Sequence, residues 1–236
     1  MIPTDRAKAL YGQIAQAVDR LEKVNGEFRL SKHKPILRIG GPSEYLHECV
    51  IPRLPDSPYD ITFTFGETKP LLQALKESNL DLLIATQHVA TSGIVFTHLA
   101  KEKFLLVGNR PLEELTDVTD SDIVRRELEQ ANWISYSAEI PIIRRFWFEA
   151  FGARNALTPC LVAPDLRVIR TMVKQGLGIS VLPDYLVQAD LQTEALHELW
   201  QPPVPVVNDL WVAYRSSDRT DDTFMHFVED MVGGSQ

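Results

Sequence analysis

Residues 36–86 read ILRIGGPSEYLHECVIPRLPDSPYDITFTFGETKPLLQALKESNLDLLIAT. Three short apolar runs in this stretch have the composition of β-strands, and they cover residues 36–40, 60–65 and 80–86. Helix-length segments at 43–54 and 70–78 separate them. Continuous apolar strands joined by helices are typical of a parallel sheet that is buried on both faces. We therefore expect two successive βαβ units and an α/β fold.

The same alternation begins again in the second half of the chain. An extended stretch over 94–108 and an acidic segment with a short helix over 113–129 come first. The expected strands then lie at 133–136, 159–162, 179–182 and 209–214, and the expected helices at 141–151, 165–175 and 222–232, with a helix or turn at 183–189. This pattern predicts two similar halves, with a final strand and helix that can return to the first half.

The N-terminal segment predicts one long helix over residues 4–28, which Thr4 can cap. Its apolar residues recur at alternating spacings of four and three residues, and they are Leu10, Ile14, Ala17, Leu21, Val24 and Phe28. This heptad seam favours pairing with a helix of another chain. Packing of the helix against its own domain stays open as the alternative.

The composition limits the classes of protein and partner. The chain has 236 residues, enough for a buried core, and its net charge of −8 at pH 7 argues against binding of the whole chain to a polyanion. It has two cysteines, no apolar signal-peptide core at its start, and no apolar run near the roughly 20 residues of a membrane span. We therefore expect a cytoplasmic protein without membrane contact, in which Cys49 and Cys160 are buried thiols.

Several short motifs follow one another in a recognisable order. They are LRIG (37–40), PS (42–43), IPRLP (51–55), FGET (65–68) with LLQAL (71–75), LDLLI (80–84) and VKQGLGISVLP (173–183). In this order they resemble the effector-binding region of the LysR-type bacterial transcriptional regulators, and the last motif looks like that family's V-x-x-G-x-G-I-x-x-L-P stretch. The sequence departs from the family at its beginning, where nearly all of the family's DNA-binding domain is missing.

The resemblance implies an α/β fold of two Rossmann-like subdomains of the periplasmic-binding-protein type, preceded by a long N-terminal helix that resembles the family's linker and dimerisation helix. The expected boundaries are 1–30 for the linker helix, 35–107 with 208–236 for effector subdomain I, and 108–207 for effector subdomain II. The resemblance also implies a homodimer or homotetramer that contacts DNA only through the missing N-terminal domain.

Ligands of doubly wound α/β domains bind beyond the carboxyl ends of the strands, where helix N-termini offer free amide groups. The polar residues in such places are Ser43, Thr68, Thr86 and His88 in the first half and Ser137 in the second. Hydroxyl and amide donors suit a small anion. Inducers of the family are often organic acids, and Ser43 and Thr68 match positions that commonly contact effector in the family. We therefore expect these five residues to bind an effector in a cleft between the two subdomains.

Simpler roles for the same residues stay open. Ser43 and Thr68 are suitable N-caps for the helices that follow them, and Asp165 has the same place before the helix at 165–175. Thr86 can be a plain strand end, and His88 can be a surface loop residue. Capping and ligand contact are compatible, so these roles do not exclude an effector site.

The sequence offers little support for catalysis or for a cofactor. It has no G-x-S-x-G nucleophile elbow, no glycine-rich phosphate loop and no pair of histidines at metal-binding spacing. Gly176 and Gly178 follow a helix rather than a strand, so they fit a helix stop and a tight entry to the next strand. We expect no catalytic residue, no metal site and no cofactor.

These observations predict the effector-sensing and oligomerisation region of a transcriptional regulator. Effector binding would shift the population between two arrangements of the subdomains and so control DNA binding by the complete protein. Two other classes share the fold, namely a solute-binding protein of a transporter and a small two-lobed enzyme. The heptad helix and the lack of a signal peptide argue against the first, and the lack of a convergent acid, base or nucleophile argues against the second.

Overall fold

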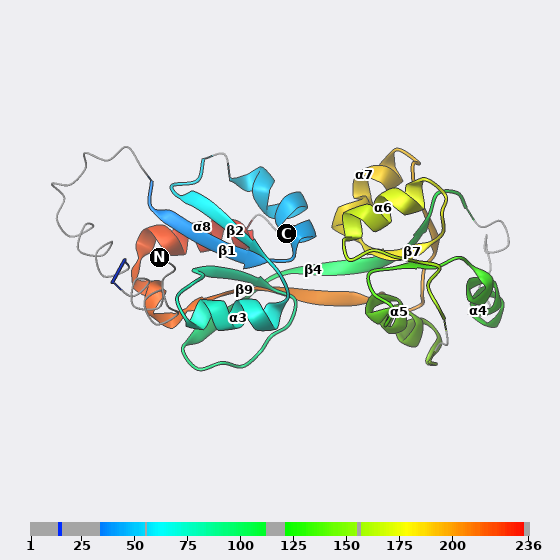
Figure 1. Ribbon diagram of the computed structural model, residues 1–236, viewed down its shortest axis with the longest axis horizontal. Helices are drawn as coiled ribbons and strands as arrows, with labels where there is room; N and C mark the ends of the chain where they lie inside the picture. The colour runs from blue at the N-terminus through cyan, green and yellow to red at the C-terminus, as the bar shows by residue number, and fades with distance from the viewer. Residues whose placement is uncertain (1–13, 16–33, 55, 112–120, 155–156, 234–236) are drawn as a thin grey trace, which may run out of the picture. The chain divides into compact units, whose positions relative to one another are not determined.

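The computed structural model describes residues 14–15, 34–54, 56–111, 121–154 and 157–233, which form two compact units. Unit 1 comprises the described residues of 1–100 and 209–236, and unit 2 comprises those of 101–208. Figure 1 shows the elements of each unit along the chain. The linker helix expected over 1–30 lies outside the described residues, except for Ile14 and Ala15, which are helical.

Unit 1 is built on three parallel strands, β1 (Ile36–Gly41), β2 (Asp60–Phe65) and β3 (Leu82–Ala85). Strand β1 pairs with β2 along its whole length and with β3 through Ile39 and Gly40. Helix α3 (Thr68–Lys76) connects β2 to β3, and its leucines pack in one core cluster with residues of β3. The α/β fold and the parallel pairing that the sequence predicts for these strands are confirmed.

The segment between β1 and β2 winds less regularly than we expected. In place of one helix over 43–54 there are a helical turn α2 (Ser43–Tyr45), a π-helical segment η1 (Leu46–Val50) and a 3-10 turn η2 (Ile51–Arg53). Pro52 lies in the last turn, where it has no N–H to continue an α-helical ladder. Leu46 and Val50 are nevertheless fully buried, so the segment still contributes to the core of unit 1.

Two long strands, β4 (Ile94–Gly108) and β9 (Val207–Arg215), contribute residues to both units. Strand β9 lies antiparallel beside β3, with Leu83 opposite Ala213 and Ala85 opposite Trp211. The sheet is therefore mixed, and the expectation of a wholly parallel sheet is wrong for β9. The chain re-enters unit 1 along β9, and this strand runs antiparallel to β3. Its apolar composition is the same as that of the parallel strands, so composition does not reveal its direction.

Helix α8 (Asp222–Gly233) closes unit 1 after the short 3-10 turn η4 (Ser216–Thr220). The helix expected over 222–232 is confirmed, and its buried residues are Phe224, Phe227, Val228 and Met231. The ring of Phe224 meets Tyr214 edge to face at 5.7 Å, and the ring of Phe227 meets Tyr59 at the same distance. These aromatic contacts fix α8 to the rest of unit 1.

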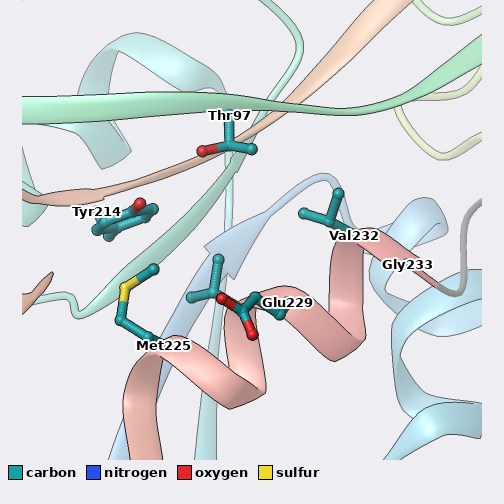
Figure 2. Close-up of a pocket in the computed structure, with 7 residues that line it drawn as sticks. Thr97, Tyr214, Met225, Glu229, Val232 and Gly233 are labelled. Carbon is teal, nitrogen blue, oxygen red and sulfur yellow. The ribbon is translucent and has the colours of Figure 1, made fainter. Parts of the chain in front are cut away.

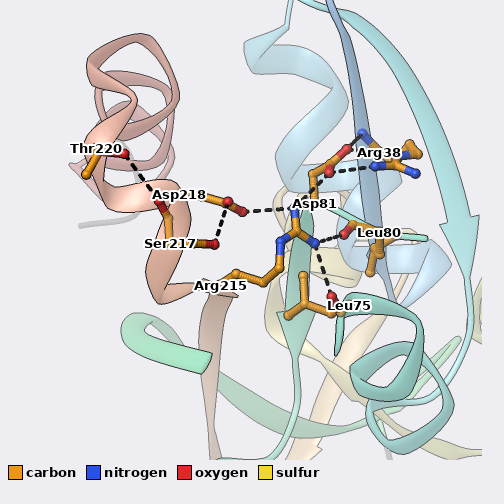
Figure 3. A network of polar contacts seen from close by, with 8 residues as sticks. All are labelled: Arg38, Leu75, Leu80, Asp81, Arg215, Ser217, Asp218 and Thr220. Atoms are coloured by element: carbon orange, nitrogen blue, oxygen red, sulfur yellow. Dashed lines mark hydrogen bonds and ion pairs between the residues drawn. The ribbon is translucent and has the colours of Figure 1, made fainter. Parts of the chain in front are cut away.

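An ionic network also holds unit 1 together (Figure 3). The carboxylate of Asp81, directly before β3, accepts hydrogen bonds from Arg38 Nε at 2.9 Å and Arg38 Nη2 at 2.8 Å. Arg215, at the end of β9, lies 3.0 Å from Asp81 and 2.9 Å from Asp218. Burial alone would raise the pKa of Asp81, but the hydrogen bonds and charge of Arg38, together with Arg215, hold it below its ordinary value. The network ties β1, β3 and β9 to one another.

In unit 2, β4 pairs antiparallel with β7 (Ser180–Pro183) and β8 (His197–Trp200), and β5 (Ile134–Ser135) pairs in parallel with β6 (Leu161–Val162). The helices of the unit are α4 (Ser121–Gln130), α5 (Pro141–Phe151), α6 (Leu166–Lys174) and α7 (Asp184–Gln192). Phe104 and Leu106 of β4 pack with α4 and α5, whereas Leu105 and Val107 pack with α6 and α7. Figure 1 shows α5 and α6 on opposite sides of β7. Successive strand residues therefore build two separate cores.

The two glycines of the GLG motif have the roles that the sequence predicts. Gly176 has φ of +75°, the left-handed conformation of a residue that ends a helix. A Cβ atom on Gly178 would lie 2.3 Å from the carbonyl oxygen of Asn132, so only glycine fits there. The close approach lets Ile179 bond with its neighbours, because Ile179 N donates to Asn132 O at 2.8 Å.

Candidate functional site

The carboxyl ends of β1, β2 and β3 place three of the predicted residues along one edge of the unit 1 sheet. Ser43 begins α2 after β1, Thr68 begins α3 after β2, and Thr86 directly follows β3. Parallel strands end on the same side of a sheet, so these hydroxyl groups share one edge. This is the kind of edge at which α/β domains bind small molecules.

Thr68 and Thr86 are in direct contact. Their hydroxyl oxygens lie 3.1 Å apart, and the backbone N–H of Thr86 donates to Thr68 Oγ1 at 3.0 Å. Thr68 is only 6% exposed, whereas Thr86 is half-buried. The pair therefore has a fixed geometry, and Thr86 is its more exposed member.

The simpler capping role is wrong for both Ser43 and Thr68. The N-cap positions are Pro42 and Glu67, and neither makes a side-chain capping bond. The extended conformation of Pro42 and Glu67 makes Ser43 and Thr68 the first helical residues, and the Thr68 hydroxyl accepts instead from Thr86. Asp165 does cap α6, because its carboxylate accepts from Arg167 N at 2.8 Å and from Val168 N at 3.4 Å. The first N–H groups of α3 thus lack the side-chain acceptor that α6 has.

His88 is exposed, as a surface loop residue would be, but its ring is not free. It packs against Phe96 with ring centroids 4.8 Å apart and against Trp211 at 5.0 Å. His98 meets the same indole at 5.4 Å, and its Nε2 lies 3.1 Å from Asp209 Oδ1. Sequence reasoning missed this aromatic cluster of His88, Phe96, His98 and Trp211. The available signal was the period-two spacing of Phe96 and His98 on β4 and of Asp209 and Trp211 on β9.

Ser137 lies in unit 2, in the loop between β5 and α5, whereas the other four predicted residues lie in unit 1. Its side chain hydrogen-bonds the carboxylate of Glu139, and this bond lowers the pKa of Glu139. The loop ends at Ile140, whose φ of +45° is rare for a β-branched residue and marks local backbone strain. Ser137 therefore belongs to a constrained loop before a helix N-terminus.

A buried acidic residue of unit 2 was also missed. Glu102 is 6% exposed, and its carboxyl group accepts a 2.9 Å hydrogen bond from Asn208 Nδ2. Arg145 bonds the other side of the same amide, with Nη1 3.2 Å from Asn208 Oδ1. Burial raises the pKa of Glu102 to about 7, and the nearby charge of Asp184 adds to the rise. Glu102 stands between Lys101 and Lys103, so the sequence there is typical of a solvated surface.

The two cysteines differ in their exposure to solvent. Cys49 is half-buried, but Cys160 is exposed, so the expectation of a buried thiol is wrong for Cys160. Its position beside Trp133, whose carbonyl oxygen lies 3.2 Å from the sulfur, places it in a surface turn. Among the residues that the structure describes, no cluster of three or more histidine, cysteine, aspartate or glutamate side chains could hold a metal ion. Within the same residues, no helix is long and apolar enough to cross a membrane.

Two α/β units that share two long strands, with hydroxyl and amide groups at a strand edge, define a small-molecule-binding module of the periplasmic-binding-protein type. Comparison with known protein families matches residues 37–233 to the LysR substrate binding domain, and the chain belongs to this family. Among curated proteins it is similar to the HTH-type transcriptional regulator AbaB of Streptomyces antibioticus, with 26% identity over 190 residues. The match covers 76% of this chain, which spans 62% of the length of AbaB.

Solved structures of LysR-type regulators have the same fold. CrgA from Neisseria meningitidis matches with a TM-score of 0.68 and 17% identity over 97% of this chain and 76% of its own. ArgP from Mycobacterium tuberculosis matches with a TM-score of 0.76 and 14% identity over 96% of this chain and 75% of its own. LysG from Corynebacterium glutamicum, solved with its effector Arg, matches with a TM-score of 0.66 and 12% identity. The match covers 99% of this chain and 79% of LysG. At these identities the likeness is one of fold.

Proposed function

We propose that this chain is the effector-sensing and oligomerisation region of a LysR-type transcriptional regulator, and that it binds a small organic acid or another small anion. The observation that carries the proposal is the contact between Thr68 and Thr86 at the N-terminus of α3. Two hydroxyl groups and uncapped backbone N–H groups converge there, and the positive end of a helix dipole favours a negative ligand.

The charges around this pair also matter for the class of ligand. Glu67 and Lys69 flank Thr68 and are both exposed, so their opposite charges nearly cancel. Preference for an anion would then rest on the hydroxyl and N–H donors, as in other sites at helix N-termini. Ser43 and His88 are the neighbouring candidates in unit 1, with Ser137 as the candidate of unit 2.

The relatives support sensing rather than catalysis. AbaB is a transcriptional regulator, and LysG was solved with a small effector bound. We infer that the complete protein controls transcription, that it is not an enzyme, and that unit 1 and unit 2 correspond to effector subdomains I and II. The site between the subdomains, the homodimer or homotetramer through the linker helix, DNA contact through a preceding domain, and the cytoplasmic location remain predictions from the sequence.

The experiment is a thermal-shift screen of the chain against small dicarboxylates, keto acids and aromatic carboxylates, with matched neutral amides and sugars beside them. An acid present at 100 times its dissociation constant should add about 2.7 kcal/mol to the free energy of unfolding. Stabilisation by acids but not by their amides supports the proposal. Stabilisation by neutral sugars alone, or by none of the acids, overturns it.

Matched variants then test the residues. Thr68→Ser keeps the hydroxyl group and should bind the acid nearly as tightly as the native chain, whereas Thr68→Val should weaken binding about tenfold. Thr171→Val is the control, because Thr171 is an exposed threonine of α6 whose hydroxyl donates to the Arg167 carbonyl in its own helix. Equal affinities for Thr68→Val and Thr171→Val would contradict the assignment.

A further inference from the structure

A cavity of about 370 Å³ lies in unit 1 beside α8 (Figure 2). One wall comes from the strands, with Thr97 of β4 and Tyr214 of β9, and the other comes from α8. None of Ser43, Thr68, Thr86 and His88 lines it. Its volume lies within the range of small-molecule sites in proteins.

The strand wall carries the hydroxyl group of Tyr214. Tyr214 is only 3% exposed, and its ring is held by the edge-to-face contact with Phe224. Figure 2 shows the hydroxyl oxygen of Tyr214 on the side of Thr97. No other residue in the described part of the chain hydrogen-bonds this oxygen. This oxygen can therefore take a hydrogen bond from a ligand group in the cavity, and such a bond contributes to affinity.

The helix wall is apolar with one acidic group. Met225, Val228, Glu229 and Val232 stand at i, i+3, i+4 and i+7 and therefore form one face of α8. Glu229 is exposed, and it makes no ion pair with any residue of the described ranges. Gly233, the last residue of α8, also lines the cavity, so the negative end of the helix dipole lies there. Of the described residues, no lysine or arginine lines the cavity.

We propose that this cavity is a second ligand site, and that it takes a small primary amine with an apolar body. The ammonium group of such a ligand has three N–H donors, and Tyr214, Thr97 and Glu229 offer oxygen acceptors. The apolar body is accommodated by Met225, Val228 and Val232. The site is distinct from the proposed anion site in place and in charge preference.

His226, on the same helix as Glu229, affects the choice of pH for the test. His226 Nδ1 lies 2.6 Å from the carbonyl oxygen of Asp222, and this bond, together with the charge of Glu229, raises the pKa of His226. A protonated His226 would weaken the attraction of Glu229 for an amine. Binding is therefore measured at pH 8.5, well above the ordinary pKa of imidazole, where a primary alkylamine is still charged.

The experiment titrates the chain with cyclohexylamine, cyclohexanol and cyclohexanecarboxylate, followed by calorimetry and by amide chemical shifts. The three probes share one ring and differ in charge. Saturable binding of the amine, weaker binding of the alcohol, no binding of the acid, and shifts at 225–233 support the proposal. No saturation by the amine up to about 10 mM, or equal binding of the acid, overturns it.

Two variants and a control locate the amine. Glu229→Gln and Tyr214→Phe should each weaken cyclohexylamine binding about fivefold, because each removes one acceptor. Asp230→Asn removes the same charge from the same helix at an exposed residue that does not line the cavity, and it should change affinity less than twofold. If Asp230→Asn weakens binding as much as Glu229→Gln, or if neither site variant weakens it, the assignment is wrong.

Discussion

The side-chain amide of Asn208 donates a 2.9 Å hydrogen bond to the buried carboxyl group of Glu102, and this bond joins β9 to β4 inside unit 2. Arg145, whose charge lowers the pKa of this carboxyl group, bonds the other end of the same amide. A carboxyl group in contact with neutral donors alone is poorly compensated for the loss of water. Glu102 is therefore a place where the fold holds a proton near neutral pH.

Stability should fall as the pH rises through the range in which Glu102 loses that proton. The folded-state pKa of about 7 exceeds the ordinary value of 4.5, so the folded chain binds more protons than the unfolded chain between these values. The protonated Glu102 side chain contributes its full stabilisation below pH 4.5, the ordinary pKa, and this stabilisation is lost by about pH 7. The loss is about 3 kcal/mol in the free energy of unfolding.

Glu102→Gln should abolish this dependence, since a glutamine can still accept from Asn208 and does not ionise. Urea unfolding of both chains between pH 5 and pH 8 measures this pH dependence of stability. The variant should be more stable than the native chain at pH 8 and comparable at pH 5. Glu149→Gln, at an exposed position of α5, is the control and should leave the profile unchanged. Parallel profiles for Glu102→Gln and the native chain would refute the prediction.

Loss of the Asp81 carboxylate should destabilise unit 1. Asp81→Asn leaves Arg215, which is mostly buried, with one fewer anionic partner, and we expect a loss of about 2–3 kcal/mol. Because the pKa of Asp81 is lowered in the folded chain, its contribution is present above the ordinary value and is lost as the pH falls through the lower folded value. Chemical unfolding at pH 7 and pH 3 measures both effects. Asp60→Asn, at an exposed residue of β2, serves as the control.

The GLG motif predicts a contrast between two glycine substitutions. Gly178→Ala would put a Cβ atom 2.3 Å from a backbone oxygen, so the backbone must shift, at a loss of about 2–3 kcal/mol. Gly152→Ala meets no atom of the described residues within 4 Å, so we expect only the penalty of its φ of +61°, about 1 kcal/mol. The free energies of unfolding of the two variants should show the larger loss for Gly178→Ala. Equal losses would show that space at Gly178 is not the limiting factor.

The element positions could be predicted from the sequence because apolar runs, glycines and prolines act locally. The strands of unit 1, the extent of α8 and the two roles of Gly176 and Gly178 follow from such signals. The direction of β9 could not be predicted, since an apolar run carries no information about the direction from which the chain arrives. The linker helix stays a prediction, because nearly all of it lies outside the described residues.

The candidate site was predictable in part, because some of its signals are also local. A polar residue after a strand identifies Thr68 and Thr86, and the structure brings these two into contact. The sequence pattern could not identify Glu102, whose environment includes Asn208 and Arg145 from distant segments. Nor could it identify the packing of His88 on Phe96 and Trp211. Contacts between residues far apart in the chain leave no local pattern in the sequence.

The most direct test of the central claim follows the backbone amides while the strongest organic acid from the screen is added. If the threonine pair and the start of α3 bind the acid, the largest chemical-shift changes in unit 1 occur at Thr68, Lys69 and Thr86, and the Thr68→Val chain loses them. If the acid binds with unchanged affinity to Thr68→Val, or if these three amides stay still while the acid saturates, the effector site lies elsewhere.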